Sequence, residues 1–64
     1  MPTRVRDRSR EMFRERLAEA LSEVFVARGF DDVTVAEAAR AVGISRATFF
    51  RYFSSKEDAA LASV

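Results

Sequence analysis

Residues 34–56, TVAEAARAVGISRATFFRYFSSK, decide the fold of this chain, because they encode two short helices joined by a sharp turn. Thr34 followed by Glu37 fits a capping box, in which each side chain satisfies a free backbone N–H of the first helical turn. Gly43 follows the apolar positions of that helix, and glycine adopts a left-handed conformation at little cost. Ser45 can cap the next helix by accepting from a backbone N–H. The pattern therefore predicts helices over residues 35–42 and 45–52.

The turn itself favours a helix-turn-helix over an ordinary helical hairpin. Ala39 lies four residues before Gly43, on the inside of the bend, where a small side chain lets two backbones approach. Ile44 would fill the corner, and the four-residue spacing of Phe49 and Phe53 supplies a buried side for the second helix. A glycine between two helices also occurs in plain hairpins, but the Ala–Gly–Ile–Ser spacing favours the tighter motif.

Helical patterns on both sides of this stretch make the fold class all-α, since no strand pattern occurs anywhere. A first helix is expected over residues 10–28 and ends at Gly29. The side chains expected to face inward from it recur at helical spacing: Phe13, Leu17, Ala20, Leu21, Val24 and Phe25. A last helix is expected over residues 55–64, capped by either Ser54 or Ser55. Because it has no terminating Gly or Pro, we expect it to continue beyond residue 64.

Composition limits the chain to one small domain and argues against several functions. The 64 residues are 48% hydrophobic and can bury one core. With no Cys and no His, the chain offers no thiolate or imidazole, and we expect no metal, no cofactor and no enzyme activity. Asp31 and Asp32 are adjacent in a linker, where neighbours seldom converge on one substrate. No apolar run approaches the roughly 18 residues that span a membrane, so we expect no membrane contact. The absence of Cys fits a reducing cytoplasm, where we expect the protein to be located.

Charges are segregated along the chain, although the formal net charge is only +1. Residues 1–16 hold six Arg against three acidic residues, residues 17–43 are acidic overall, and residues 44–56 hold three basic residues and no acid. Such asymmetry suggests a polyanionic partner. Residues 1–9 look like a flexible basic arm, which could follow a DNA backbone or enter a minor groove, or could simply be a solvated tail. The arginines available to it are Arg4, Arg6, Arg8 and Arg10.

The helix expected over residues 45–52 is basic and free of acidic residues, as required for reading a DNA major groove. Arg46 can donate two parallel hydrogen bonds to guanine, or it can bond to a phosphate. Ala47 is small enough to contact a thymine methyl group, and the Thr48 hydroxyl can donate to a phosphate. Arg51 could reach either a base edge or the backbone.

Three further side chains belong to the same candidate surface. Phe50 follows Phe49, and a helix cannot bury both rings fully, so one is expected at the surface. Tyr52 offers a ring to the core and a hydroxyl to a phosphate. Lys56 can meet a phosphate near the positive end of the last helix, or it can remain a free surface lysine.

These residues resemble a known family. The run from Gly29 to Leu61 resembles the N-terminal DNA-binding domain of the tetracycline-repressor (TetR) family of bacterial regulators. The matching pieces are residues 25–30, 34–35, 39, 43–45, 48–53 and 55–57, and the resemblance covers roughly residues 10–61. It implies a homeodomain-like three-helix bundle with the start of a fourth helix. It also places these residues at DNA-facing positions: Thr34, Ala36, Arg46, Ala47, Thr48, Phe50, Arg51, Tyr52 and Lys56.

The resemblance implies a sequence-specific transcription regulator, a repressor in the reading we favour, that binds double-stranded DNA. The full-length protein would be a homodimer on a palindromic operator, whereas residues 10–64 would be the DNA-binding domain alone, without the ligand-binding and dimerisation domain. We expect the 64-residue chain to be a monomer. Phe50 replaces the usual Tyr, Ala36 a longer polar residue and Ala38 a larger aliphatic one. A purely protein-binding module is the main alternative, and its affinity would depend little on salt.

Overall fold

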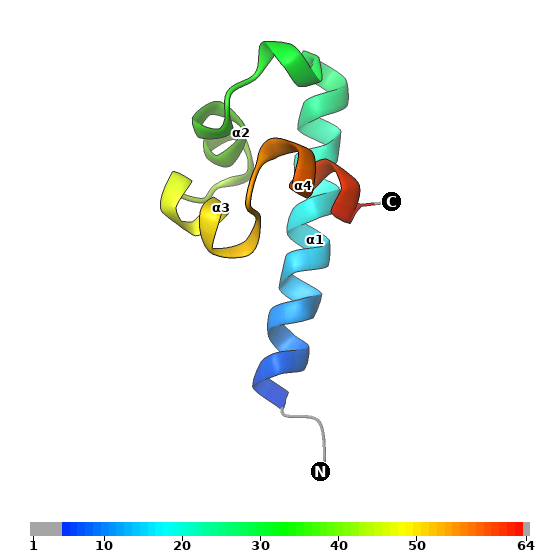
Figure 1. Cartoon of the computed structure of the whole chain (residues 1–64), viewed down its shortest axis with the longest axis vertical. Helices are drawn as coiled ribbons and strands as arrows, with labels where there is room; N and C mark the ends of the chain where they lie inside the picture. Colours follow the sequence, from blue (N-terminus) through cyan, green and yellow to red (C-terminus); the bar gives the residue numbers. More distant parts are fainter. Residues whose placement is uncertain (1–4, 64) are drawn as a thin grey trace.

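A computed structural model describes the backbone of residues 5–63 and the side chains of residues 9–63. It consists of α1 (Val5–Arg28), a short 3₁₀ turn η1 (Phe30–Asp32), α2 (Val35–Val42), α3 (Arg46–Tyr52) and α4 (Lys56–Ala62). Every element in this described part is helical, which confirms the all-α fold class. Figure 1 shows the three shorter helices gathered around the C-terminal half of α1, while its N-terminal turns extend beyond them.

The first helix begins earlier than the sequence suggested. α1 starts at Val5, not at residue 10, so the prediction of a flexible arm over residues 1–9 is wrong for residues 5–9. Arg6 and Arg8 favour helix intrinsically, and a helix that is already nucleated extends without a new nucleation cost. Arg4 lies outside the described residues, as do the side chains of Arg6 and Arg8, while the side chain of Arg10 is exposed.

The other helix boundaries lie within two residues of the prediction. Residue 64, the predicted end of the last helix, lies outside the described residues. α2 has the expected bounds, and α3 and α4 each begin one residue later because a serine occupies the cap position. Ser45 accepts from the Thr48 N–H at 3.0 Å. Ser55, and not Ser54, caps α4 by accepting from the Asp58 N–H at 3.0 Å. These caps fix where each short helix starts.

The bend between α2 and α3 has the backbone geometry expected of its glycine. Gly43 lies in the left-handed region, with φ 87° and ψ 25°. Its N–H donates to the Arg40 carbonyl at 3.1 Å, and the Ile44 N–H donates to the Ala39 carbonyl at 2.9 Å. This pair of bonds is the Schellman arrangement, which satisfies the last carbonyls of α2 while it reverses the chain. At the other end of α2, Thr34 and Glu37 form the predicted capping box.

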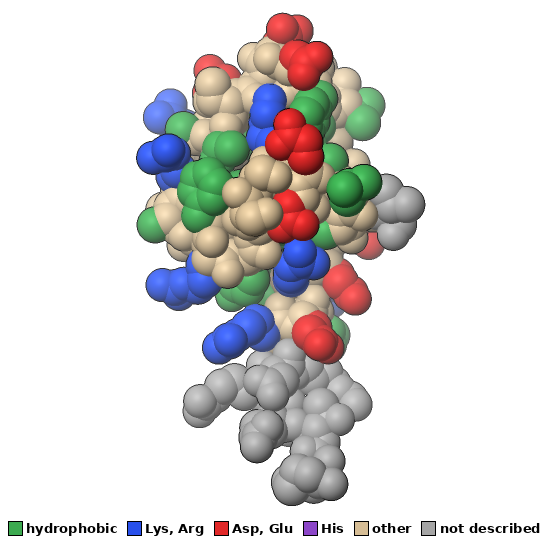
Figure 2. All heavy atoms as spheres, in the orientation of Figure 1, with side chains coloured by type: hydrophobic (Ala, Val, Ile, Leu, Met, Phe, Trp, Pro, Cys, Tyr) green, Lys and Arg blue, Asp and Glu red, His purple; other side chains and the backbone are tan. Residues whose placement is uncertain are grey.

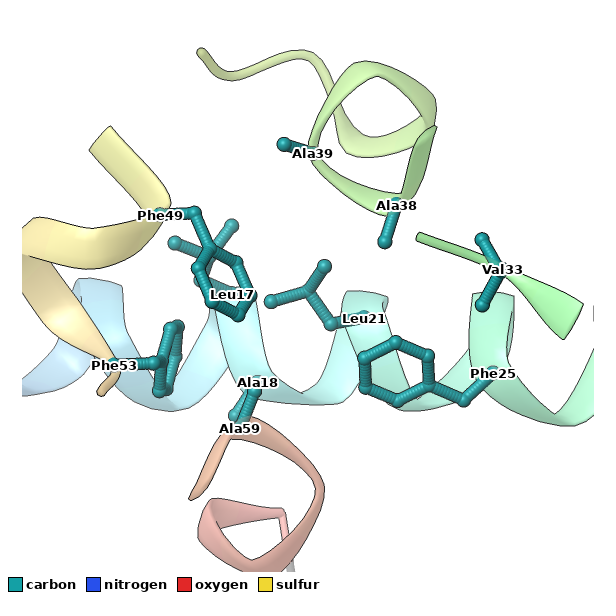
Figure 3. Close-up of a cluster of buried hydrophobic side chains, with 10 residues drawn as sticks. All are labelled: Leu17, Ala18, Leu21, Phe25, Val33, Ala38, Ala39, Phe49, Phe53 and Ala59. Atoms are coloured by element: carbon teal, nitrogen blue, oxygen red, sulfur yellow. The ribbon is translucent and has the colours of Figure 1, made fainter. Parts of the chain in front are cut away.

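The core lies where α1 meets the three shorter helices. Figure 3 shows its buried side chains pointing toward one another from all four helices and from the linker before α2: Leu17, Ala18, Leu21, Phe25, Val33, Ala38, Ala39, Phe49, Phe53 and Ala59. Ala18 and Ala59 are fully buried, and their small size lets α4 approach α1 closely. Phe49 and Phe53 fill the space beside α3, with ring centroids 5.4 Å apart.

The expected inward stripe of α1 is correct only in part. Leu17, Leu21 and Phe25 are buried, and Ala20 and Val24 are half-buried. Phe13 is 44% exposed, because the core ends before this turn of α1. Its ring instead meets the edge of the Tyr52 ring, with centroids 5.3 Å apart.

Replacing Gly43 with alanine is expected to lower the free energy of unfolding by about 1–2 kcal/mol, which is what a left-handed conformation costs an L-residue. A Cβ atom at this position would meet no atom within 4 Å, so backbone strain and not collision causes the loss. Gly43→Asn is the matched control and should lose less, since asparagine tolerates this conformation. Urea unfolding followed by circular dichroism measures both. Equal losses for the two variants would contradict this account of the turn.

Candidate nucleic-acid interface

α3 turns one aromatic ring inward and leaves a basic face at the surface. Phe49 is completely buried, whereas its neighbour Phe50 is 44% exposed. The remaining α3 side chains on the candidate surface are exposed (Arg46, Ala47 and Arg51) or half-buried (Thr48 and Tyr52). Since α3 contains no acidic residue, this face can approach a polyanion without like-charge repulsion.

An arginine and an aromatic ring stack on this face. The Arg46 guanidinium lies over the Phe50 ring, with Cζ 5.5 Å from the centroid. Phe50 in turn meets Phe49 edge-on at 5.1 Å, so the buried ring supports the exposed one. The stack limits the motion of a long side chain and reduces the entropy that it would lose on binding.

The cap of α3 also prepares a hydroxyl donor. Ser45 Oγ accepts from the Thr48 N–H and donates to Thr48 Oγ1, both at 3.0 Å. Because Thr48 Oγ1 is the acceptor in this bond, its own hydroxyl proton is not used by Ser45 and can be donated. A phosphate oxygen is a suitable acceptor for such a proton.

The outer side of the helix-turn-helix bend is hollowed. A surface hollow of about 420 Å³ lies between α2 and the start of α3, lined by Ala36, Arg40, Gly43, Ile44, Ser45 and Arg46. Thr34 and Ala36 are exposed at the N-terminal end of α2, so α2 contributes to the same surface. Figure 2 shows Lys and Arg side chains mainly along the side that carries α2 and α3, and Asp and Glu mainly elsewhere on this face of the molecule.

Sequence reasoning missed Arg40 as a member of this surface. Its side chain is exposed and lines the hollow beside Arg46. The signal was present in the sequence, because Arg40 follows Ala36 by four residues and therefore shares its helix face. The net charge of residues 17–43 hides this position, because that segment is acidic overall.

Arg14 is a second residue that the sequence did not single out. Its Nε donates to the Tyr52 carbonyl at 3.0 Å, and its Nη2 lies 3.6 Å from Asp58 Oδ2. The guanidinium also lies over the Phe53 ring, with Cζ 4.9 Å from the centroid. Arg14 thus ties the C-terminal end of α3 to α1. No local pattern could reveal this contact, because 38 residues separate the bonded pair.

Lys56 is placed differently from the other candidate DNA-facing residues. It is half-buried, and its ammonium donates to the Phe30 and Val33 carbonyls in the linker between α1 and α2. The ammonium therefore faces the protein backbone, and its contact with DNA stays a prediction.

The capping box of α2 perturbs one carboxyl group. The Thr34 backbone N–H donates to Glu37 Oε1 at 2.9 Å and thereby holds the pKa of Glu37 below its ordinary value. The Thr34 side chain and the positive charges of Arg28 and Arg40 act in the same direction. Because the folded-state pKa is lowered, the ionised carboxylate stabilises the fold.

This stabilisation is expected to be present at neutral pH and to disappear as the pH falls through the folded-state pKa of Glu37. Glu37→Gln is the matched variant, because glutamine can still form a capping box but does not ionise. Wild type should be slightly more stable than the variant at neutral pH and equally stable in acid. Urea unfolding at several pH values measures the difference, and a difference independent of pH would show that the carboxylate charge plays no part.

The comparisons with known proteins agree with this geometry. The model of the family described as bacterial regulatory proteins, tetR family, matches residues 17–62. The chain is 38% identical over 60 residues to the HTH-type transcriptional regulator TcmR of Streptomyces glaucescens, across 94% of the chain and 26% of TcmR. It is 50% identical over 40 residues to the putative mycofactocin biosynthesis transcriptional regulator MftR of Mycobacterium tuberculosis, across 62% of the chain and 20% of MftR. No solved structure matches the chain significantly.

Proposed function

The chain belongs to the tetR family of bacterial regulatory proteins and is a DNA-binding domain of that family, and we propose that it recognises a specific sequence by placing α3 in the major groove. The observation that supports this proposal is the acid-free, exposed face of α3 beyond the Gly43 bend. A helix presented in this way fits the width of the major groove of B-DNA. TetR-family regulators bind DNA. Our proposal adds that α3 enters the major groove and that binding prefers a particular base sequence.

Some residues of this face are proposed to contact base edges, and others to contact the sugar-phosphate backbone of DNA. We propose that Arg46 donates to the O6 and N7 atoms of a guanine, since its guanidinium is exposed and supported by Phe50. Ala47 is small enough to accommodate a thymine methyl group. Contacts with the sugar-phosphate backbone of DNA are proposed for the polar and aromatic side chains at the rim and for the small residue beside them: Thr34, Thr48, Phe50, Arg51, Tyr52 and Ala36, with Arg40 and Arg10 as additional cations.

We further propose that the regulator to which this domain belongs is a repressor that binds a palindromic operator as a homodimer. The reading helix has only seven residues, and a second copy related by twofold symmetry would double its contacts. The matched segment is about a quarter of TcmR and a fifth of MftR, so properties of a whole regulator are part of this proposal. We propose the cytoplasm as its location, and none of the described helices is long and apolar enough to cross a membrane.

Selection of bound sites from random duplex DNA, at two salt concentrations, tests the proposed function. We expect a short common sequence to be recovered, with affinity that falls steeply as salt rises, because phosphate contacts release counterions. Recovery of no common sequence would contradict sequence-specific recognition. Affinity that is insensitive to salt would favour a protein-binding module instead.

Replacing Arg46 with alanine is expected to weaken binding to a selected site by about fivefold or more, since about 1 kcal/mol is the low end for a bidentate arginine–guanine pair. It should also relax the preference at one base pair. Arg28→Ala is the matched control, because it removes the same charge from an exposed position at the end of α1. Fluorescence anisotropy on the selected site and its single-base variants measures both effects. Equal losses on the selected site and on random duplex would remove the base-reading role of Arg46.

The chain alone is expected to be a monomer that binds a half-site only weakly. Its exposed large apolar side chains are scattered over α1, α3 and α4, which gives little continuous surface for a stable dimer. Sedimentation velocity at micromolar concentration measures the association state. A tight dimer under these conditions would show that the 64 residues contain a dimer interface.

A further inference from the structure

Lys56 is the only lysine of the chain, and its ammonium is held within the fold. Its Nζ lies 2.6 Å from the Phe30 carbonyl oxygen and 3.0 Å from the Val33 carbonyl oxygen. The same atom lies 4.4 Å from the centroid of the Phe30 ring. Three contacts thus place the ammonium against η1 and the residue that follows it.

This environment separates Lys56 from most of the basic surface. Among the basic side chains that the structure describes, only Arg14 and Lys56 are half-buried, and both donate to backbone carbonyls of distant elements. The remaining ones are exposed: Arg10, Arg16, Arg28, Arg40, Arg46 and Arg51. Of the basic side chains described, two therefore act as internal ties, and the exposed ones are available for a polyanion.

If the Lys56 ammonium turned toward a DNA phosphate, it would lose hydrogen bonds within the protein. A lysine ammonium has three N–H donors, and two of them are bonded to the linker carbonyls. One carbonyl belongs to Phe30, the first residue of the 3₁₀ turn, and the other to Val33, which directly follows the turn, so the ammonium is bonded at both ends of η1. Hydrogen bonds to a charged donor are stronger than neutral ones, so a phosphate would have to replace both of them and the ring contact.

The bond to Val33 acts on a peptide that also belongs to the cap of α2. The Val33 carbonyl and the Thr34 N–H are the two ends of one peptide unit. Lys56 donates to the carbonyl, and the N–H donates to Glu37 Oε1 at 2.9 Å. This peptide is therefore held from both sides, by α4 and by α2. Since the peptide plane is rigid, its orientation sets the direction in which Thr34 and the first turn of α2 face.

In place of the phosphate contact predicted from the sequence, we propose that Lys56 is a positioning residue for DNA binding: it fastens η1 to the start of α4 and holds the N-terminal end of α2 at the DNA-facing surface, without bonding to a phosphate. This inference rests on the proposed function, because it concerns how the same surface is held in place. It assigns to Lys56 a different role from that of the exposed arginines of α3. Removal of the ammonium should then weaken binding without removing a phosphate contact.

The wild-type protein gives the first test, in the absence and presence of a selected duplex. Because the chain has one lysine, its side-chain ammonium gives a single, unambiguous ¹⁵N NMR signal apart from the N-terminal amine. We expect slow hydrogen exchange in the free protein and no change in that signal when the duplex is added. A rapidly exchanging ammonium in the free protein, or a large shift on binding, would overturn the proposal.

The salt dependence of binding gives the second test. Lys56→Met keeps the aliphatic stem, and we expect it to bind about tenfold more weakly, or about 1.4 kcal/mol, at every salt concentration. The slope of log K against log salt should stay at the wild-type value. Arg51→Met is the matched control and should reduce that slope by about 0.9, the value for one phosphate contact. A reduction of the same size for Lys56→Met would show that Lys56 binds a phosphate and would overturn the proposal.

A second control tests whether Lys56→Met binds DNA more weakly only because it is less stable. Val24 is a half-buried residue of α1 that packs against the core and lines a hollow with Ala41 and Val42 at the C-terminal end of α2. Val24→Ala therefore lowers stability without removing either hydrogen bond of Lys56. At a temperature where all variants are folded, it should bind DNA like wild type, and Lys56→Met should not. Equal binding by Lys56→Met and wild type would overturn the proposal. A wild-type chain that binds no duplex would refute the proposed function, while the ammonium signal of the free protein would still show whether the tie to η1 exists.

Discussion

The left-handed backbone of Gly43 is the constraint on which the arrangement of this domain depends. The bend allows two backbone hydrogen bonds to satisfy the carbonyls at the end of α2. It also sets α3 at an angle to α2, because only Ile44 separates Gly43 from the Ser45 cap of α3. That angle lets Phe49 enter the core while the next residue along α3 stays outside. A wider turn would separate the buried ring from the exposed basic face. The division of α3 into a core side and a DNA side therefore follows from a single backbone conformation.

The helices are too short to be stable alone, and long cationic side chains join their ends. Isolated helices of seven or eight residues are marginal in water, so α2, α3 and α4 depend on packing against α1 and on their caps. Arg14 links α1 to the end of α3, and Lys56 links α4 to the turn before α2. Both side chains lie at the edge of the core, where their stems are covered and their charged groups reach carbonyl oxygens. Arg14 and Lys56 thus differ from the exposed arginines, because their charged groups bond to the protein backbone.

Local sequence signals predicted the parts of the structure that depend on neighbours in the chain. The capping box at Thr34, the bend at Gly43 and the cap at Ser45 involve residues at most five positions apart, and the structure has all three. The polarity of residues 5–9 predicts a flexible arm, but α1 already starts at Val5, because arginine forms helices well. Arg14 and Lys56 were not recognised as ties, because their partners lie 38 and 26 residues away. Only the three-dimensional arrangement distinguishes a cation that supports the fold from one that faces solvent.

The central claim is that the bend at Gly43 directs the arginine-bearing face of α3 to the edges of bases in the major groove. It is tested most directly by binding to a selected duplex in which each guanine is replaced in turn by 7-deazaguanine, which lacks only the N7 acceptor in that groove. The account predicts a several-fold loss of affinity at one guanine of the half-site and none when inosine, which lacks the minor-groove amino group, takes its place. Unchanged affinity for every 7-deazaguanine duplex, with a loss for an inosine duplex, would contradict it.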